Sequence, residues 1–251
     1  MGFRLFRLGY FKEIKRDFLS KGSISLSLKR FFKRLIQGVA TCVLFSLVML
    51  LRADDNQWLS KALLKEAEQK FGSEAKQRLL DWQTLYISLK NKDEKEKLKA
   101  VNDFFNSKVN FISDQKHWGQ EDYWATPFEA LTTQGADCED YVIAKYYTLK
   151  ELGVDVEKMR ITYVKALRIN QAHMVLTYFP TPDAIPLVLD NLIGQITSAE
   201  RRKDLEPVYS FNGSGMWLER MKGKGIRMGN PNKLDLWTGL RLKMAAQDME
   251  I

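Results

Sequence analysis

"TTQGADCEDYVIAKYYTLKELG", residues 132–153, predicts a helix that begins at Cys138, runs to about Leu152 and stops at Gly153. Unpaired N–H groups at a helix start favour a thiolate, so a cysteine placed there can serve as a nucleophile. The carboxylates on both sides of this cysteine oppose its ionisation. The segment therefore predicts a reactive thiol only where that negative charge is neutralised.

The segments around this helix change character along the chain. Helical patterns come first, at residues 54–72, 73–91 and 93–112, and a short helix is expected to begin at Thr126-Pro127. Strand-like runs follow the cysteine helix; they are "RITYVKAL" (160–167), "AHMVLTYF" (172–179), "IPLVLDNL" (185–192) and "PVYSFNGSGMWL" (207–218). Helices followed by adjacent strands with short turns predict an α+β fold with an antiparallel sheet, against which the cysteine-bearing helix lies.

The positive charge of the chain is confined to its N-terminal segment. The 251 residues include 39 Lys and Arg against 31 Asp and Glu, a formal net charge of +8. Residues 1–52 hold 11 basic and two acidic side chains, which leaves 28 basic and 29 acidic side chains in residues 53–251. Because the second part is nearly neutral, the composition argues against a nucleic-acid-binding protein.

An uncharged apolar run, 35–51, follows the basic segment. The run is at the short end for a membrane-spanning helix and is also typical of a signal sequence. Basic residues before the run and a mixed-charge domain after it predict that the C-terminal part is exported, and anionic lipids are the expected contact of the basic segment. Cleavage near Ala53 and retention as an anchor remain open, with a slight preference for the anchor, and a buried core helix is the third interpretation. We therefore divide the chain into a lead with its signal or anchor segment, 1–52, and a domain, 53–251.

Cysteine chemistry in the exported part depends on one thiol. Cys42 lies in the apolar run, so Cys138 has no disulfide partner after export. A cysteine nucleophile needs a base and a third group that orients the base. His173 lies at the start of one predicted strand and Asp190 in the next, and neighbouring antiparallel strands can place two such side chains together. These three residues are the predicted catalytic triad; the alternative gives each of them a purely structural role.

Three acids flank the predicted nucleophile: Asp137, Glu139 and Asp140. Calcium takes oxygen ligands, and these carboxylates can supply several of them. The spacing is too tight for an EF-hand loop, so other oxygens would have to complete the coordination shell. The other interpretation is that the acids cap the helix and complement its dipole, and the spacing alone favours capping.

Four separated blocks resemble the bacterial transglutaminase-like cysteine proteases of the LapG type: "GADCEDYVIAKYYTLKELGV", "AHMVLTY", "LVLDNL" and "VYSFNGSGMWL". The resemblance covers about residues 54–218. It implies a papain-related, transglutaminase-like fold and a periplasmic endopeptidase. It implies that Cys138, His173 and Asp190 are the catalytic residues. It also implies a calcium site at Asp137 and Glu139, with Asp140 joining them, and so favours the metal over capping.

The resemblance implies partners as well. Proteases of this type cut the N-terminal region of a large outer-membrane-tethered adhesin next to a di-alanine, which promotes biofilm dispersal. An inner-membrane receptor that binds cyclic di-GMP on its cytoplasmic side sequesters them on its periplasmic side. The long basic lead departs from the family pattern and leaves soluble or anchored status open. Two alternatives stand beside the protease: transglutaminase or amidase chemistry, and a calcium-dependent binding module without catalysis.

Overall fold

The computed structural model describes residues 58–218, 225–230 and 234–249. The chain divides into two compact units, 1–56 and 57–251, and the described residues all belong to the second unit. The predicted signal or anchor segment lies outside the described residues. Among the helices that are described, none combines the length and the apolar character that a membrane crossing requires.

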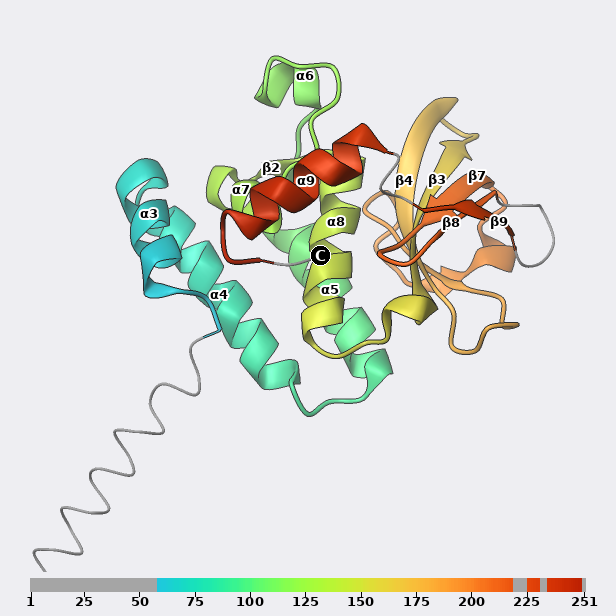
Figure 1. Cartoon of the computed structure of the whole chain (residues 1–251), viewed down its shortest axis with the longest axis horizontal. Helices are drawn as coiled ribbons and strands as arrows, with labels where there is room; N and C mark the ends of the chain where they lie inside the picture. Colours follow the sequence, from blue (N-terminus) through green and yellow to red (C-terminus); the bar gives the residue numbers. More distant parts are fainter. Residues whose placement is uncertain (1–57, 219–224, 231–233, 250–251) are drawn as a thin grey trace, which may run out of the picture. The chain divides into compact units, whose positions relative to one another are not determined.

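Three helices form the N-terminal part of the domain (Figure 1). They are α3 (Lys61–Phe71), α4 (Ser73–Leu89) and α5 (Glu94–Lys108), and they confirm the three predicted helices. The third ends earlier than the predicted range 93–112, because Asn110 and Phe111 form a strand. Two of them begin at side chains that accept a backbone N–H: Ser60 accepts that of Leu63, and Asp93 accepts that of Glu96. Gly72 separates α3 from α4 with a φ of 88°, which glycine adopts without steric strain.

Short elements connect this layer to the cysteine helix. They are β1 (Asn110–Phe111), α6 (Asp114–His117), α7 (Pro127–Thr133) and β2 (Gly135–Ala136), followed by α8 (Cys138–Glu151). The α7 helix begins with a capping box, in which Thr126 accepts the N–H of Glu129 and Glu129 accepts the N–H of Thr126. The parallel pair β1–β2 then brings the chain into line with the start of α8.

The strands after α8 form a seven-stranded antiparallel sheet in the order β6-β5-β4-β3-β7-β8-β9. Their bounds are β3 (Met159–Ala166), β4 (Gln171–Tyr178), β5 (Leu187–Leu189), β6 (Thr197–Ser198), β7 (Leu205–Phe211), β8 (Met216–Leu218) and β9 (Ile226–Gly229). Short 3-10 helices, η1 (Val156–Lys158) and η2 (Ala199–Arg201), precede β3 and β7. Along the β3–β4 pair, Val164 lies opposite His173. The structure confirms the predicted α+β class and the antiparallel sheet.

The cysteine helix lies between the helical layer and the sheet. α8 packs on α5 on one side and on β4 and β3 on the other, as Figure 1 shows. Its residues from Asp140 to Leu149 are all buried, and Trp82 of α4 donates from Nε1 to Thr148 Oγ1 at 2.9 Å. A C-terminal helix, α9 (Asp235–Ala245), covers α8 through Trp237. Packing on every side therefore fixes the direction in which the start of α8 points.

Asp190 lies one residue beyond β5 and not within a strand as the sequence predicted. Its carboxylate Oδ1 accepts the backbone N–H of Leu192 at 3.0 Å. A hydrogen bond from an aspartate side chain to the backbone two residues on forms an Asx turn, and this turn ends the strand. Because β5 pairs with β4, the turn still leaves Asp190 beside His173.

Candidate active site

His173 and Asp190 form a buried hydrogen-bonded pair. Nε2 of His173 lies 2.8 Å from Oδ1 of Asp190. The two residues are only 4% and 1% exposed, respectively, so water competes little for this contact. Since Nε2 is engaged with the carboxylate, Nδ1 is the ring nitrogen available for a proton transfer elsewhere. The sequence prediction that neighbouring strands bring these side chains together is therefore realised in the structure.

The carboxylate of Asp190 is held on both oxygens. Oδ1 accepts from His173 and from the N–H of Leu192, and Oδ2 accepts from Nη2 of Arg202 at 2.7 Å. Its backbone carbonyl also accepts from Nδ2 of Asn106 at 2.8 Å. Burial by itself would raise the pKa of Asp190, but the contacts with His173 first, and then with Leu192 and Arg202, lower it to about 2. The carboxylate is therefore ionised at any pH at which the protein would operate.

Cys138 is the first residue of α8 and faces β4. The backbone N–H of Met174, the residue after His173, donates toward its sulfur. This contact places the thiol against the strand that carries the imidazole. The thiol itself donates to Oε2 of Glu139 at 2.9 Å. Burial, and then the charge of Glu139, raise the pKa of Cys138 well above its ordinary value, so the sulfur is protonated in this arrangement.

A cluster of carboxylates surrounds the start of α8, and we call it the acidic cluster. It contains Asp137, Glu139 and Asp140, which the sequence predicted, together with Asp114 of α6 and Asp122 of the following loop. Three overlapping groups bring potential ligand atoms within 4.8 Å of one another: Asp137 with Cys138 and Glu139, Asp114 with Asp137 and Asp140, and Asp114 with Asp122 and Glu139. The cluster therefore joins two segments far apart in the sequence.

The acidic cluster has the properties of a cation site. Burial and neighbouring negative charges raise the pKa of Asp137 to about 10, and burial raises those of Asp114 and Asp140. Oδ1 of Asp114 and Oδ1 of Asp137 are buried without a hydrogen-bond partner. Buried polar atoms normally have a hydrogen-bond partner, and a bound ion can take the place of one. Calcium is coordinated by oxygen atoms such as these. The residues present therefore fit a bound calcium ion.

Asp140 serves the local structure at the same time. Its two oxygens accept the backbone N–H groups of Ala125, at 2.6 Å, and of Asp137, at 3.3 Å. The second bond is the helix cap that the sequence also suggested. Capping and cation binding are thus compatible, because one carboxylate oxygen can accept more than one contact.

The segment 122–125 is held between the acidic cluster and α9. The backbone N–H of Tyr123 donates to Oδ2 of Asp114, and Lys243 of α9 donates to the carbonyl of Trp124, each at 2.5 Å. The Lys243 ammonium also lies 3.6 Å from the centre of the Tyr123 ring. The C-terminal helix therefore supports the loop that carries Asp122.

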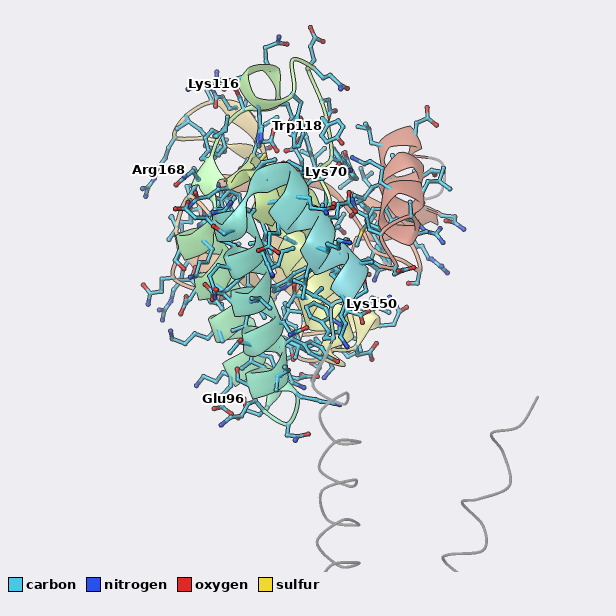
Figure 2. The ribbon with its side chains drawn as sticks, turned by 90° about the vertical axis from the view of Figure 1, so that its left-hand side faces the viewer. Lys70, Glu96, Lys116, Trp118, Lys150 and Arg168 are labelled. Carbon is cyan, nitrogen blue, oxygen red and sulfur yellow. The ribbon has the colours of Figure 1, made fainter. Side chains whose placement is uncertain are left out.

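The aromatic residues before α7 have different roles. Trp118 follows α6, below which Figure 2 labels it, and stacks on His117 with ring centres 4.2 Å apart. Tyr123 tilts against Trp118, and these two rings are candidates for a substrate-binding wall. Trp124 is not, because it is only 5% exposed and stacks on Phe211 in the core.

Comparison with known proteins decides the family. Residues 74–204 match the bacterial transglutaminase-like cysteine proteinase family, BTLCP. The chain belongs to this family. Among solved structures, this proteinase is similar to LapG of Legionella pneumophila in an EGTA-treated form, with 41% identity over 72% of this chain and 94% of that one and a TM-score of 0.64. The calcium-bound form of that LapG gives 40% identity, 72% and 97% coverage, and a TM-score of 0.63. A search of curated proteins found no match.

Three residues of this BTLCP proteinase were missing from the sequence prediction. Asp114 begins the short helix α6 and Asp122 lies in the loop after it, in a polar stretch where acids are common, and only the fold brings them to the start of α8. Arg202 lies in the charged run "AERRKD", in which nothing distinguishes it from its exposed neighbour Arg201. A contact between distant segments leaves no periodic signal in a single sequence.

Proposed function

We propose that the chain is a calcium-dependent cysteine endopeptidase in which Cys138, His173 and Asp190 form the catalytic triad. The observation that carries this proposal is the buried His173–Asp190 hydrogen bond on the strand that faces the thiol. Membership of a cysteine proteinase family supports the reaction class. A purely structural His–Asp pair would not require a cysteine at the facing helix start.

The proposed reaction gives each of these residues one role. His173 takes the thiol proton through Nδ1, because Nε2 is held by Asp190. The sulfur attacks the scissile carbonyl, and His173 returns the proton to the departing amine. Water then hydrolyses the thioester, with His173 again as the base. Asp190 keeps the ring in place and stabilises its cationic form. The backbone N–H of Cys138, at the start of α8, is an oxyanion donor.

The acidic cluster links this chemistry to calcium. When calcium is bound, its positive charge offsets the carboxylates that hold the sulfur in its protonated form. Asp114, Asp122, Asp137, Glu139 and Asp140 would hold the ion, and Asp140 would also hold the loop through the N–H of Ala125. Glu139 would connect the ion directly to the thiol, since its carboxylate accepts the thiol hydrogen. Calcium binding by the LapG of Legionella pneumophila supports this assignment.

The biological setting is proposed from the same family likeness. The substrate would be the N-terminal region of a large surface adhesin, cut near a di-alanine in the periplasm, with release of the adhesin and biofilm dispersal. An inner-membrane receptor for cyclic di-GMP would sequester the enzyme. The apolar run 35–51, the uncharged part of the N-terminal lead, would direct export of the domain or anchor it in the inner membrane.

The acyl acceptor separates the protease from its main alternative. An amine in place of water would give transglutaminase chemistry on the same thioester. Both reactions use the triad, so the products distinguish them. A binding module without catalysis is disfavoured by the intact His173–Asp190 pair beside a free thiol.

The test incubates the purified full-length chain with N-terminal fragments of candidate adhesins, with calcium or with EGTA. Mass spectrometry is expected to find a cut fragment in calcium and an intact one in EGTA, with calcium and not magnesium restoring cleavage. Cys138→Ala, which is expected to leave the fold and partner binding intact, should be inactive. Activity that survives in Cys138→Ala removes the nucleophile assignment, and an isopeptide cross-link in place of a cut selects the transglutaminase.

A further inference from the structure

Arg202 lies directly behind the His173–Asp190 pair. Its side chain is 3% exposed, and Nη2 donates to Oδ2 of Asp190 at 2.7 Å, on the side of the carboxylate away from the imidazole. The three side chains thus form a chain of hydrogen bonds, from the imidazole through the carboxylate to the guanidinium. Nothing in the proposed reaction requires a cation at this place.

A second carboxylate fixes the guanidinium. Nε and Nη2 of Arg202 donate to the two oxygens of Asp204, at 3.0 and 2.9 Å. This two-point contact sets the plane and the direction of the guanidinium, which a single contact would leave free. Nη2 therefore reaches Asp190 from a defined direction. The side chain of Asp204 is more exposed than that of Arg202, so this chain of hydrogen bonds ends nearer to solvent.

Other groups around Asp190 do not replace this contact. Lys145 of α8 is buried and faces the same carboxylate, but its ammonium donates to Oδ1 of Asn102 at 2.9 Å. Asn106 of α5 binds the backbone carbonyl of Asp190 and not its side chain. Arg202 is thus the charged group hydrogen-bonded to Oδ2 among the described residues.

We propose that Arg202 is a positioning residue of the active site, which holds the Asp190 carboxylate so that its other oxygen orients His173 toward Cys138. The inference rests on the proposed function and adds a residue to it. Arg202 also keeps Asp190 ionised in a buried setting, because a carboxylate removed from water needs a charged partner. Without the guanidinium, Asp190 takes up a proton at a higher pH, and the neutral acid no longer stabilises the imidazolium.

The test measures the reactivity of the thiol and needs no knowledge of the substrate. The full-length chain carries Cys42→Ser, so that Cys138 is its one cysteine, and iodoacetamide alkylation is followed from pH 4 to pH 9 in calcium. Arg202→Met is compared with Arg201→Met, which removes the exposed neighbouring arginine. Arg202→Lys tests rescue by charge, and circular dichroism reports whether each variant folds.

Arg202→Met is expected to slow alkylation by about 10- to 100-fold at pH 7, because a displaced partner misaligns the reacting groups. The acid limb of its pH profile should move to higher pH. Arg202→Lys should recover part of the rate, and Arg201→Met should match the parent chain. A folded Arg202→Met chain with the parent rate and profile overturns the proposal.

A second variant covers the case in which Arg202→Met fails to fold. Asp204→Asn keeps the guanidinium and weakens the contact that directs it, so alkylation should slow by about two- to fivefold. A parent rate and profile in folded Asp204→Asn then overturns the proposal. If the parent chain alkylates normally but cuts no adhesin fragment, the proposed substrate fails while the role of Arg202 is still decided by these rates.

Discussion

The thiol of Cys138 donates a hydrogen bond to Oε2 of Glu139, its immediate neighbour in the chain, over 2.9 Å. The contact indicates how the reactivity of a cysteine among carboxylates can be controlled. With the negative charge of Glu139 beside it, the sulfur keeps its proton; the same carboxylate is a candidate cation ligand. A cation at the acidic cluster would compete for Glu139 and so release the thiol.

Glu139→Gln should therefore uncouple thiol reactivity from calcium. In EGTA, removal of the charge lowers the pKa of Cys138, and each unit of pKa gives about tenfold more thiolate at neutral pH. Alkylation of Cys138 in EGTA should rise by about that factor, while added calcium should produce little further increase. Glu121→Gln, which removes an exposed acid of the same loop region, serves as the control. Slower alkylation of Glu139→Gln in EGTA would show that the carboxylate activates the sulfur.

Asp114 and Asp122 should contribute to calcium affinity although they come from α6 and the following loop and not from the start of α8. Asp114→Asn and Asp122→Asn each remove one charged oxygen ligand, and affinity is expected to fall by about tenfold or more. Isothermal titration calorimetry measures the change. Glu206→Gln, an exposed acid on β7, should leave the affinity unaltered. Unchanged affinity in both aspartate variants would confine the site to the residues next to Cys138.

Gly135 provides a steric test of the same region. A Cβ at this position would lie 2.4 Å from Cε1 of His117, too close for any real contact. Gly135→Ala should displace His117 and with it α6, which carries Asp114, so both the melting temperature and the calcium affinity should fall. His117→Ala removes the obstructing ring and should restore both in the double variant. Gly239→Ala meets no atom within 4 Å and serves as the control. Failure of the double variant to recover would place the strain elsewhere.

Lys145 should make stability depend on pH. Burial lowers the pKa of Lys145 to about 7, whereas an unfolded lysine holds its proton up to about 10.4. Between these two pH values the unfolded chain binds more protons than the folded chain, so the free energy of unfolding rises with pH. Below pH 7 the buried ammonium is charged in the folded state and destabilises it to the full extent. Lys145→Met removes this dependence, and any advantage of the variant over the parent chain should shrink between pH 7 and pH 9. Urea unfolding at both pH values measures the difference.

The control for this experiment is Lys65→Met, which changes an exposed lysine. Its free energy of unfolding should run parallel to that of the parent chain across the same pH range. A constant difference between Lys145→Met and the parent chain would mean that the buried ammonium keeps its proton throughout.

Local sequence patterns predicted most of the helices and strands. The start of α8 at Cys138 followed from turn and helix signals, and the pairing of β4 with β5 followed from adjacent strand patterns. Asp190 was expected within a strand because apolar residues surround it, but its side chain binds the N–H of Leu192 and ends the strand. A side chain that competes with a neighbouring strand for a backbone N–H leaves no mark on the alternation of apolar and polar residues.

The candidate site was predicted less completely than the fold. His173 and Asp190 lie on neighbouring strands, so their contact needs only one pairing. Asp114, in contrast, meets Asp137 only after β1 pairs with β2 and α6 folds across them. Arg202 became distinct from Arg201 only through its burial. Charged residues that act through tertiary contacts look like ordinary surface charges in one sequence.

The central claim is that the imidazole of His173 activates the sulfur of Cys138. The chain has two histidines, so His173→Ala and His117→Ala form a matched pair. The deciding measurement is the rate of Cys138 alkylation by iodoacetamide at pH 7 in calcium, in chains that carry Cys42→Ser. The account predicts a fall of about 100-fold for His173→Ala, which loses its base, and a rate near that of the parent chain for His117→Ala. Equal rates in folded His173→Ala and the parent chain would contradict it.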